Sequence, residues 1–250
     1  MISHPKYKSI KPGFQSEFRT APLKSFVSGK PYYFFAKRLI DIVVASLVTL
    51  LVLSWLVPVV ALLIKLSSRG PVFFIQRRVG KGGHGFPCLK FRTMVVNEQA
   101  HTCQANENDM RITRLGRFLR HSNIDEFPQF LNVLVGHMSI VGPRPHMYTD
   151  CTKFGKLIAG YKFRNMVRPG ITGLAQIKGY RGPTKDFKSM FHRYQLDAFY
   201  IRNANFWLDM RIIRKTIAQT FNLIFKRLTD GKAPQKLSSY RKWAAVLFLF

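Results

Sequence analysis

The sequence contains few acidic residues. It has 12 Asp and Glu against 40 Lys and Arg in 250 residues, which gives a formal net charge of +28 at pH 7. A charge this large indicates an anionic partner, which can be a nucleic acid, an anionic lipid or a phosphorylated substrate. The hydrophobic fraction of 47% still allows one ordinary domain with its own core.

Paired cysteines and nucleotide-binding loops are also missing. The three cysteines are scattered and form no CxxC pair, which argues against a disulfide scaffold or a zinc cluster and favours a reducing compartment. Three glycines between residues 80 and 85 match GxGxxG, but Pro87 and a strand-like run follow where a dinucleotide-binding loop needs a helix. Residues 70–94 therefore predict a β-hairpin with a glycine-rich turn.

Charge is absent from one long stretch near the N-terminus, Ile42–Ile64. As a helix, these 23 residues would be about 34 Å long, enough to cross the hydrocarbon core of a bilayer. The stretch starts too far into the chain and is too long for a signal peptide. We expect this segment to lie in a membrane.

Basic residues flank the apolar stretch on both sides, so the positive-inside rule is best satisfied if both ends stay in the cytoplasm. Pro58 removes one backbone N–H and clashes with the carbonyl of Ser54, which predicts a bend between these two residues. A re-entrant hairpin and a kinked single span are both compatible with this pattern. The residues alone leave the two alternatives open.

The only adjacent acidic pair in the sequence, Asp125–Glu126, follows an arginine-rich stretch, residues 111–121, that predicts a helix. A second helix, ending at Gly136, is expected to begin at about residues 124–126, which places both carboxylates at its N-terminus. One interpretation is that they only cap this helix, where backbone N–H groups favour anions.

A phosphate-binding site is the other interpretation of the acidic pair. Arg144 lies between two prolines, and Arg168 precedes Pro169 and Gly170, so both guanidinium groups are presented by rigid loops. The planar fork of arginine suits bidentate phosphate binding. Further along, residues 187–217 interleave aromatic and basic residues, which predicts amphipathic helices against the core or a membrane interface. The same pattern also suits single-stranded nucleic acid.

Seven motifs, spread over about residues 37–217, resemble one known family in order and spacing. They are "KRLIDIVVASL", "GPVFFIQRRVG", "LKFRTM", "NIDEFPQFLNVL", "MSIVGPRP", "VRPGITGLAQIKGYRG" and "DAFYIRNANFWLDMRII". The chain resembles the bacterial sugar transferases, also called monotopic phosphoglycosyl transferases, and among them the hexose-1-phosphate-transferring branch. Two positions differ from the family pattern. His137 stands where an aspartate is usual, and Pro58 lies three residues beyond the usual Ser-Pro break.

The resemblance implies an activity and a set of site residues. The family transfers a sugar 1-phosphate from a UDP-sugar to undecaprenyl phosphate through an aspartyl-phosphosugar intermediate, releases UMP, and so initiates exopolysaccharide, capsule or O-antigen assembly. By resemblance, Asp125 is the nucleophile and Glu126 a ligand of Mg²⁺. Donor and phosphate binding would fall to Lys90, Arg120, Arg144 and Arg168, with Arg92 and Arg117 as further candidates.

The same resemblance implies an α+β, mostly α, monotopic membrane protein with a re-entrant membrane helix broken at Ser54 and Pro58, a short β-hairpin and interfacial amphipathic helices. We expect four segments: a basic N-terminal segment (1–30), the re-entrant helix (31–69), a cytoplasmic catalytic domain (70–222) and a basic, apolar tail (223–250). The protein would lie in the bacterial inner membrane with its catalytic domain facing the cytoplasm. The oligomeric state stays open, with a homodimer as the candidate that a membrane surface favours, and no nucleic-acid partner is expected.

The competing hypothesis is a membrane-anchored protein that binds nucleic acid or anionic lipid without catalysis. Its charge, aromatic residues and membrane segment are all compatible with that role. It gives no reason for an acidic pair inside the most basic region, because carboxylates there would weaken binding to a phosphate backbone.

Overall fold

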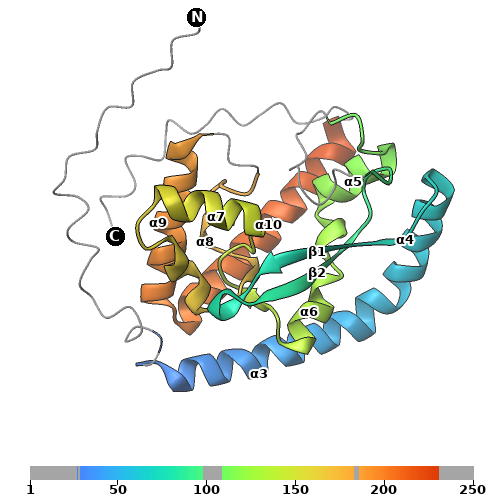
Figure 1. The fold of residues 1–250 in the computed structure, drawn as a ribbon. Helices are drawn as coiled ribbons and strands as arrows, with labels where there is room; N and C mark the ends of the chain where they lie inside the picture. Colours follow the sequence, from blue (N-terminus) through green and yellow to red (C-terminus); the bar gives the residue numbers. More distant parts are fainter. Residues whose placement is uncertain (1–26, 28, 98–108, 183–185, 231–250) are drawn as a thin grey trace, which may run out of the picture.

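A computed structural model of the protein describes residues 27, 29–97, 109–182 and 186–230, with the side chains of 223–230 left undescribed. The described chain is mostly helical and carries one antiparallel β-hairpin and one long apolar helix near its N-terminus. The coarse fold class expected from the sequence is thus confirmed. The long helix runs along one edge of the molecule (Figure 1).

The N-terminal helix is continuous over Pro31–Ser67 and contains an 18-residue window with a mean hydropathy of 2.8, so it is long and apolar enough to cross a membrane. It consists of α3 (Pro31–Val48), a π-helical turn (Thr49–Leu53) and α4 (Ser54–Ser67). The wider π turn immediately precedes the Ser54–Pro58 stretch where the sequence predicts a bend, because Pro58 cannot donate to the carbonyl of Ser54. Figure 1 shows the helix curving upward along α4.

Two side chains at the bend donate hydrogen bonds to backbone carbonyl groups. The Ser54 hydroxyl donates to the Leu50 carbonyl at 2.7 Å, and the Trp55 indole N–H donates to the Leu51 carbonyl at 3.0 Å. Both side chains are exposed on the apolar helix. Polar groups of this kind lower the free-energy cost of an irregular turn in a lipid environment.

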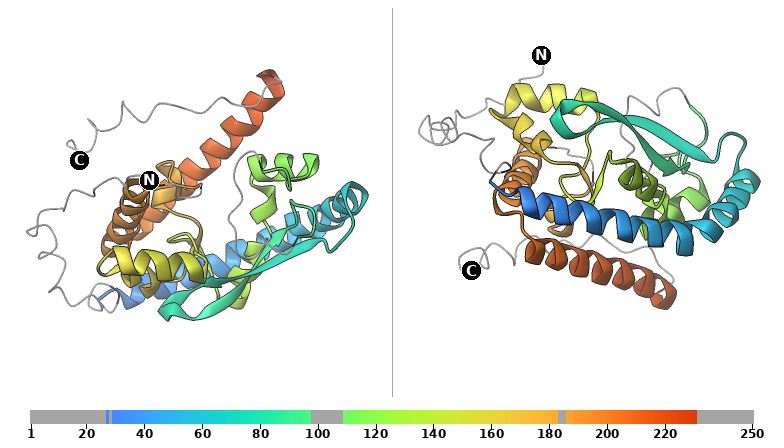
Figure 2. Two further views of the ribbon diagram at one scale, coloured as in Figure 1. Left: turned by 45° about the horizontal axis from the view of Figure 1, so that its top comes forward. Right: turned by 90° about the horizontal axis from the view of Figure 1, so that it is seen from below.

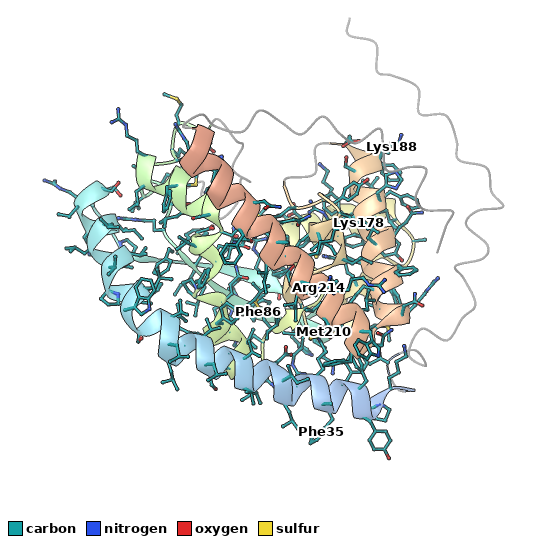
Figure 3. The ribbon with its side chains drawn as sticks, turned by 180° about the vertical axis from the view of Figure 1, so that it is seen from behind. Phe35, Phe86, Lys178, Lys188, Met210 and Arg214 are labelled. Carbon is teal, nitrogen blue, oxygen red and sulfur yellow. The ribbon has the colours of Figure 1, made fainter. Side chains whose placement is uncertain are left out.

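One face of the long helix packs against the domain through Ala45, Leu53, Leu56, Val60 and Ile64. The opposite face is exposed and apolar, and Phe35 projects from α3 away from the domain (Figure 3). This face also includes Leu39, Val43, Leu47, Leu50, Leu51, Val59, Leu62 and Leu66. Exposed apolar surface of this extent on a helix is typical of a membrane contact.

Polar side chains attach the long helix to the domain. Asp41, which is 3% exposed, accepts a hydrogen bond from the Ile140 N–H at 2.9 Å. Arg38 donates to the carbonyls of Val133 and Leu134 at the C-terminal end of α6 (Gln129–Val135). The helix is therefore held at two points by hydrogen bonds to backbone groups, as well as by apolar packing.

A third attachment joins α3 to the C-terminal helices α9 (Phe187–Asn203) and α10 (Phe206–Asp230). Tyr33 and Lys37 of α3 donate to one carboxylate oxygen of Asp209 at 2.8 and 2.7 Å, and Tyr200 of α9 donates to the other oxygen at 2.8 Å. In Figure 2, α3 with α4 and the C-terminal helix α10 both lie along the outside of the domain.

The predicted hairpin is confirmed. Strands β1 (Phe73–Val79) and β2 (Gly85–Phe91) pair antiparallel, with Phe73 opposite Phe91 and Val79 opposite Gly85. The glycine-rich residues form the connecting turn, where Gly82 and Gly83 have φ values of 69° and 85°, which side chains with a Cβ rarely adopt. The GxGxxG match is thus a turn and not a dinucleotide-binding loop.

The acidic pair lies in a tight connection between two helices. Helix α5 (Arg114–Ser122) ends at Asn123, whose φ of 60° turns the chain, and Asp125 and Glu126 belong to the 3₁₀ turn Ile124–Glu126 ahead of α6. Asn132 of α6 accepts from the Leu89 N–H at 2.9 Å and donates to the Pro87 carbonyl at 2.7 Å. These bonds fix the acidic turn against strand β2.

Two short parallel strands, β3 (Ser139–Val141) and β4 (Gly170–Thr172), bring the two rigid arginine loops together. A Cβ on Gly142 would lie 2.5 Å from the Arg168 carbonyl oxygen, and one on Gly170 would lie 2.1 Å from the Gly142 nitrogen. Only glycine allows this approach. Sequence periodicity did not predict this pairing, because each strand has only three residues.

The remaining elements complete the core behind the hairpin. They are α7 (Tyr148–Leu157), the 3₁₀ segment Tyr161–Met166 and α8 (Leu174–Ile177), which pack with α9 and α10. Helix α10 continues past residue 222, where the sequence suggested the catalytic domain would end, to Asp230. Most of the expected N-terminal segment and residues 231–250 of the tail lie outside the described residues.

Candidate active site

A cavity of about 500 Å³ opens along one face of the hairpin. Its wall is formed by both strands, the acidic 3₁₀ turn, the loop 143–147 and side chains from α5, α7 and α9. Five of the six residues expected to form the site line this one cavity: Asp125, Glu126, Lys90, Arg120 and Arg144. The fold therefore brings together most of the positions that the motifs indicated.

Glu126 is surrounded by cations. Its Oε1 lies 2.7 Å from Lys90 Nζ and 2.7 Å from Arg144 Nη2, and its Oε2 lies 2.9 Å from Arg181 Nη2. Burial by itself would raise the pKa of Glu126, but Arg144, Lys90 and Arg181 outweigh burial and hold the pKa well below its usual range. Glu126 is thus ionised and holds three cationic side chains at one point of the cavity wall.

Asp125, the residue next to Glu126, has no cationic partner among the described residues, and its pKa is shifted in the opposite direction. Its carboxylate makes no hydrogen bond or ion pair with any residue that the structure describes, and the residue is 9% exposed where it lines the cavity. Burial and then the negative charge of Glu126 raise the pKa of Asp125 to about 6. A buried, unpaired carboxylate that is still ionised at neutral pH is a suitable nucleophile.

Arg120 lies next to Asp125 on the side of the cavity nearer α4. Its Nε donates to the Thr93 hydroxyl at 2.8 Å, and its charge acts on Asp125 through space. A Cβ on Gly116, one turn earlier in α5, would lie 1.9 Å from the Thr93 carbonyl oxygen. The absence of a side chain at residue 116 therefore allows α5 to pack against Thr93 and fixes the position of Arg120.

Arg168 is the expected site residue that the structure places elsewhere. It does not line the cavity, and its Nε donates to the Gly136 carbonyl at 2.8 Å, near Arg38 and the C-terminal end of α6. Although the β3–β4 pairing brings the loops of Arg144 and Arg168 together, their side chains have different partners. In this structure Arg144 lines the cavity and Arg168 does not, and phosphate binding by Arg168 stays a prediction.

The two further arginine candidates also have structural surroundings of their own. Arg92 lines the cavity, but its guanidinium donates to the carbonyls of Ser68 and Arg69 just after α4, so it ties the hairpin to the long apolar helix. Arg117 is exposed on α5 and does not line the cavity. His137 packs its ring against Phe86 with centroids 5.5 Å apart, also away from the cavity lining.

A family model described as bacterial sugar transferase matches residues 32–223. The chain belongs to the bacterial sugar transferase family. The match includes the long helix, the hairpin, the acidic turn and all the residues that line the cavity.

Three curated relatives illustrate the similarity. A UDP-glucose:undecaprenyl-phosphate glucose-1-phosphate transferase of Klebsiella pneumoniae is 47% identical over 74% of this chain and 40% of its own length. A UDP-N-acetylgalactosamine-undecaprenyl-phosphate N-acetylgalactosaminephosphotransferase of Aeromonas hydrophila is 45% identical over 75% of this chain and 44% of its own length. An exopolysaccharide production protein of Rhizobium leguminosarum bv. phaseoli is 44% identical over 78% of this chain and 96% of its own length. The chain thus spans less than half the length of the first two relatives.

In this member of the sugar transferase family, sequence reasoning missed four basic residues of the cavity wall: Arg181, Arg78, His146 and Arg193. Arg181 had a detectable signal, because it precedes Gly182 and Pro183 in the same way that Arg168 precedes Pro169 and Gly170. No comparable signal marked Arg193, which lies within a helix and is buried only through tertiary packing.

The Mg²⁺ that the family resemblance implies has few ligands from the protein here. Among the described residues, no three His, Cys, Asp or Glu side chains come close enough together to hold a metal ion. The oxygens of Glu126 are already shared by three cations. The residues present therefore do not fit a resident Mg²⁺ bound by Glu126.

Proposed function

We propose that this chain transfers a sugar 1-phosphate from a UDP-hexose to undecaprenyl phosphate and releases UMP. The observation that carries this proposal is the contrast between two adjacent carboxylates in one cationic cavity, Glu126 bound by three cations and Asp125 unpaired. The names of the relatives, which describe transfer of glucose or N-acetylgalactosamine phosphate to undecaprenyl phosphate, support it. The glucose and N-acetylgalactosamine relatives are 47% and 45% identical to this chain, so sequence identity does not indicate which sugar this chain transfers.

The first half-reaction would be a displacement at the β-phosphorus of the donor. A carboxylate oxygen of Asp125 attacks this phosphorus, the bond from phosphorus to the oxygen bridging the two phosphates breaks, and UMP leaves with the bonding electron pair. The product is an acyl phosphate between Asp125 and the sugar phosphate, a species with a good leaving group. No proton transfer is needed, because the attacking group is already an anion.

In the second half-reaction, an oxygen of undecaprenyl phosphate attacks the same phosphorus and the carboxylate of Asp125 leaves. A lipid-linked diphosphate sugar forms, and the enzyme returns to its starting state. The negative charge on phosphorus and its oxygens would be offset by Lys90, Arg120, Arg144 and Arg181 around the cavity. Coulomb repulsion between an anionic nucleophile and an anionic diphosphate would otherwise oppose the attack.

Glu126 would act as the anchor of these cations. Because it holds Lys90, Arg144 and Arg181 within 2.9 Å of its carboxylate, it fixes their positions before the donor arrives, which reduces reorganisation during the reaction. We further propose that Mg²⁺ enters together with the diphosphate, which offers the oxygen ligands that this ion prefers. Calorimetric titration should then show Mg²⁺ binding only with the donor present, and Mg²⁺ binding to the protein alone would contradict this.

The long apolar helix would place the cavity at the cytoplasmic surface of the inner membrane. We propose that it is re-entrant, entering and leaving through the cytoplasmic leaflet and bending at the π turn before Ser54. A soluble UDP-sugar and the phosphate of a membrane lipid would then reach the cavity at the same depth. The attachment of Arg92 to Ser68 and Arg69 holds the cavity close to the end of α4.

The test is UMP release from a panel of UDP-sugars by purified protein with undecaprenyl phosphate and Mg²⁺. Asp125→Asn should reduce turnover by at least about 10³-fold, since the nucleophile is lost. Asp186→Asn is the matched control, because Asp186 is exposed, caps α9 through the Ser189 N–H, and can be replaced in that role by asparagine. Full turnover by Asp125→Asn would exclude the covalent mechanism, and absence of turnover with every donor would exclude the proposed function.

A further inference from the structure

The cavity has a second group of cations at the end farther from α4. Arg78 of β1 and Arg193 of α9 line this end together with His146. Arg78 donates to the Pro145 carbonyl at 3.1 Å, and Arg193 Nη1 lies 3.4 Å from His146 Nε2. His146 itself is held by the Tyr161 hydroxyl, 2.6 Å from its Nδ1. None of these residues takes part in the ion pairs of Glu126.

The positive charge at this end exceeds the negative charge that faces it. Arg164 is paired with Asp197 at 2.8 Å, and the charge of Asp197 also acts on Arg193. Asp150 is the acid that lines this end of the cavity. Arg193 is only 7% exposed, and the Nε atoms of Arg193 and Arg78 have no hydrogen-bond partner. Burial and the nearby Arg144 lower the pKa of Arg193 to about 10. Buried cations without full compensation are costly and indicate a site for an anion.

We propose that Arg78 and Arg193 form an anion subsite for the phosphate that is attached to the nucleoside, and that this subsite holds UMP as it leaves. The inference rests on the proposed function, and it assigns the two ends of one cavity to the two substrates. The nucleotide occupies the end at α7 and α9. After UMP has left, the lipid phosphate displaces Asp125 from the face of the phosphorus that UMP vacated, with its polyprenyl chain toward the end at α4.

The lining of the cavity supports this direction. The end near α4 contains the apolar residues Pro71, Phe73, Met94, Val95 and Val96, and Val95 and Val96 are exposed. That end suits a polyprenyl chain, whereas the end at Arg78 and Arg193 is polar and suits a nucleotide.

The position of the nucleophile supports the same direction. Asp125 and Arg120 lie on the α4 side of the cavity. Arg120 donates a hydrogen bond to Thr93, and the adjacent residue Arg92 donates to the Arg69 carbonyl just after α4. The loop that carries Arg144, the partner of Glu126, continues through Pro145 to His146 at the end of the cavity near α7 and α9. In a displacement at phosphorus, the leaving group departs roughly opposite the attacking oxygen. UMP therefore leaves toward Arg78 and Arg193.

The experiment measures UMP binding by calorimetry, which needs no turnover, alongside steady-state KM values for donor and acceptor. We expect Arg78→Gln and Arg193→Lys each to weaken UMP binding and to raise the donor KM by at least about tenfold, the loss typical of a hydrogen bond to a charged group. Lys188→Gln is the control, because Lys188 is exposed on the same helix as Arg193 (Figure 3) and does not line the cavity.

Each outcome decides the inference. A raised acceptor KM with unchanged UMP binding, unchanged UMP binding in both variants, or failure of the wild-type protein to bind UMP would overturn it. If Arg193→Lys does not fold, the half-buried Arg78 provides the measurement alone. Failure of the proposed function has a different signature: UMP binding that depends on Arg78, without turnover of any UDP-sugar, would retain the subsite and reject the transferase activity.

Discussion

At the residue scale, the oxygens of Glu126 are shared by Lys90, Arg144 and Arg181, while the carboxylate of Asp125, one residue earlier, faces the cavity unpaired. The 3₁₀ turn produces this difference, because consecutive side chains in a tight turn point in different directions. The pKa of Glu126 is lowered and that of Asp125 is raised. Environments that separate the pKa values of two neighbouring acids mark the groups with different roles.

The raised pKa of Asp125 predicts the pH dependence of catalysis. Attack needs the ionised carboxylate, so kcat/KM should be constant above about pH 7 and should fall tenfold per pH unit below about pH 6. The measurement is the pH profile of kcat/KM for the donor at saturating acceptor. A profile that stays flat down to pH 4.5 would show that ionisation of Asp125 does not limit the reaction.

The same pKa shift predicts an effect on stability. A carboxyl group whose pKa is raised in the folded state contributes most below its unfolded value of 3.8, and its contribution is lost as pH rises through about 6. At pH 7.5, Asp125→Asn should therefore increase the free energy of unfolding, by up to about 3 kcal/mol. The gain should disappear below pH 4. Thermal unfolding of both proteins in detergent at the two pH values checks this, and a less stable variant at pH 7.5 would contradict it.

At the element scale, the contact of α5 with the segment after β2 controls the geometry of the cavity. Gly116 lies against the Thr93 carbonyl, Thr113 caps the helix through the Gly116 N–H at 2.9 Å, and Arg120 binds the Thr93 hydroxyl. These three contacts place the helix that carries Arg120 at the edge of the cavity. A change in the helix position would move this cation away from Asp125.

Substitution of Gly116 tests this arrangement. In Gly116→Ala, the new Cβ would meet the Thr93 carbonyl oxygen at 1.9 Å, so we expect a loss of about 1–3 kcal/mol in the free energy of unfolding and a lower kcat. Gly155→Ala is the matched control, because Gly155 lies within α7 and has no atom within 4 Å of the added Cβ. It should gain about 0.5–1 kcal/mol. Equal effects of the two substitutions on unfolding would contradict the close contact.

At the scale of the whole molecule, the long helix and the catalytic domain behave as one unit. Asp41, Arg38 and the Asp209 cluster bind the helix to β3, α6 and α10 with hydrogen bonds as well as apolar packing. If the helix lies in a bilayer as proposed, its exposed face determines how the cavity is oriented relative to that bilayer. A re-entrant helix would keep both of its ends, and the cavity, on the cytoplasmic side.

Single-cysteine labelling tests this topology. Gly29→Cys and Arg69→Cys place thiols at exposed positions on either side of the helix, in a variant with the three native cysteines replaced by alanine. In intact spheroplasts, neither should react with a membrane-impermeant maleimide, and both should react after permeabilisation. Lys188→Cys, at an exposed position on α9, is the control for the surface of the domain. Reaction of one of the two flanking thiols in intact cells would establish a straight span.

The sequence by itself determined the features that depend on local chemistry. Proline at residue 58 predicted the irregular turn near Ser54, glycines and a following proline predicted the hairpin turn, and the apolar run predicted the long exposed helix. The motifs located Asp125, Glu126, Lys90, Arg120 and Arg144 in one site. These features can be read from sequence because each depends on neighbouring residues or on an ordered set of motifs.

Only the tertiary structure decided which cations surround which carboxylate. Arg144 and Arg168 have similar local sequences and adjacent loops, yet Arg144 binds Glu126 and Arg168 binds the Gly136 carbonyl. Arg181 and Arg193 reach the cavity through the packing of segments more than 50 residues from the acidic pair. Side-chain direction and burial depend on these long-range contacts, and a three-residue parallel pairing such as β3–β4 leaves no periodic pattern in the sequence from which they could be read.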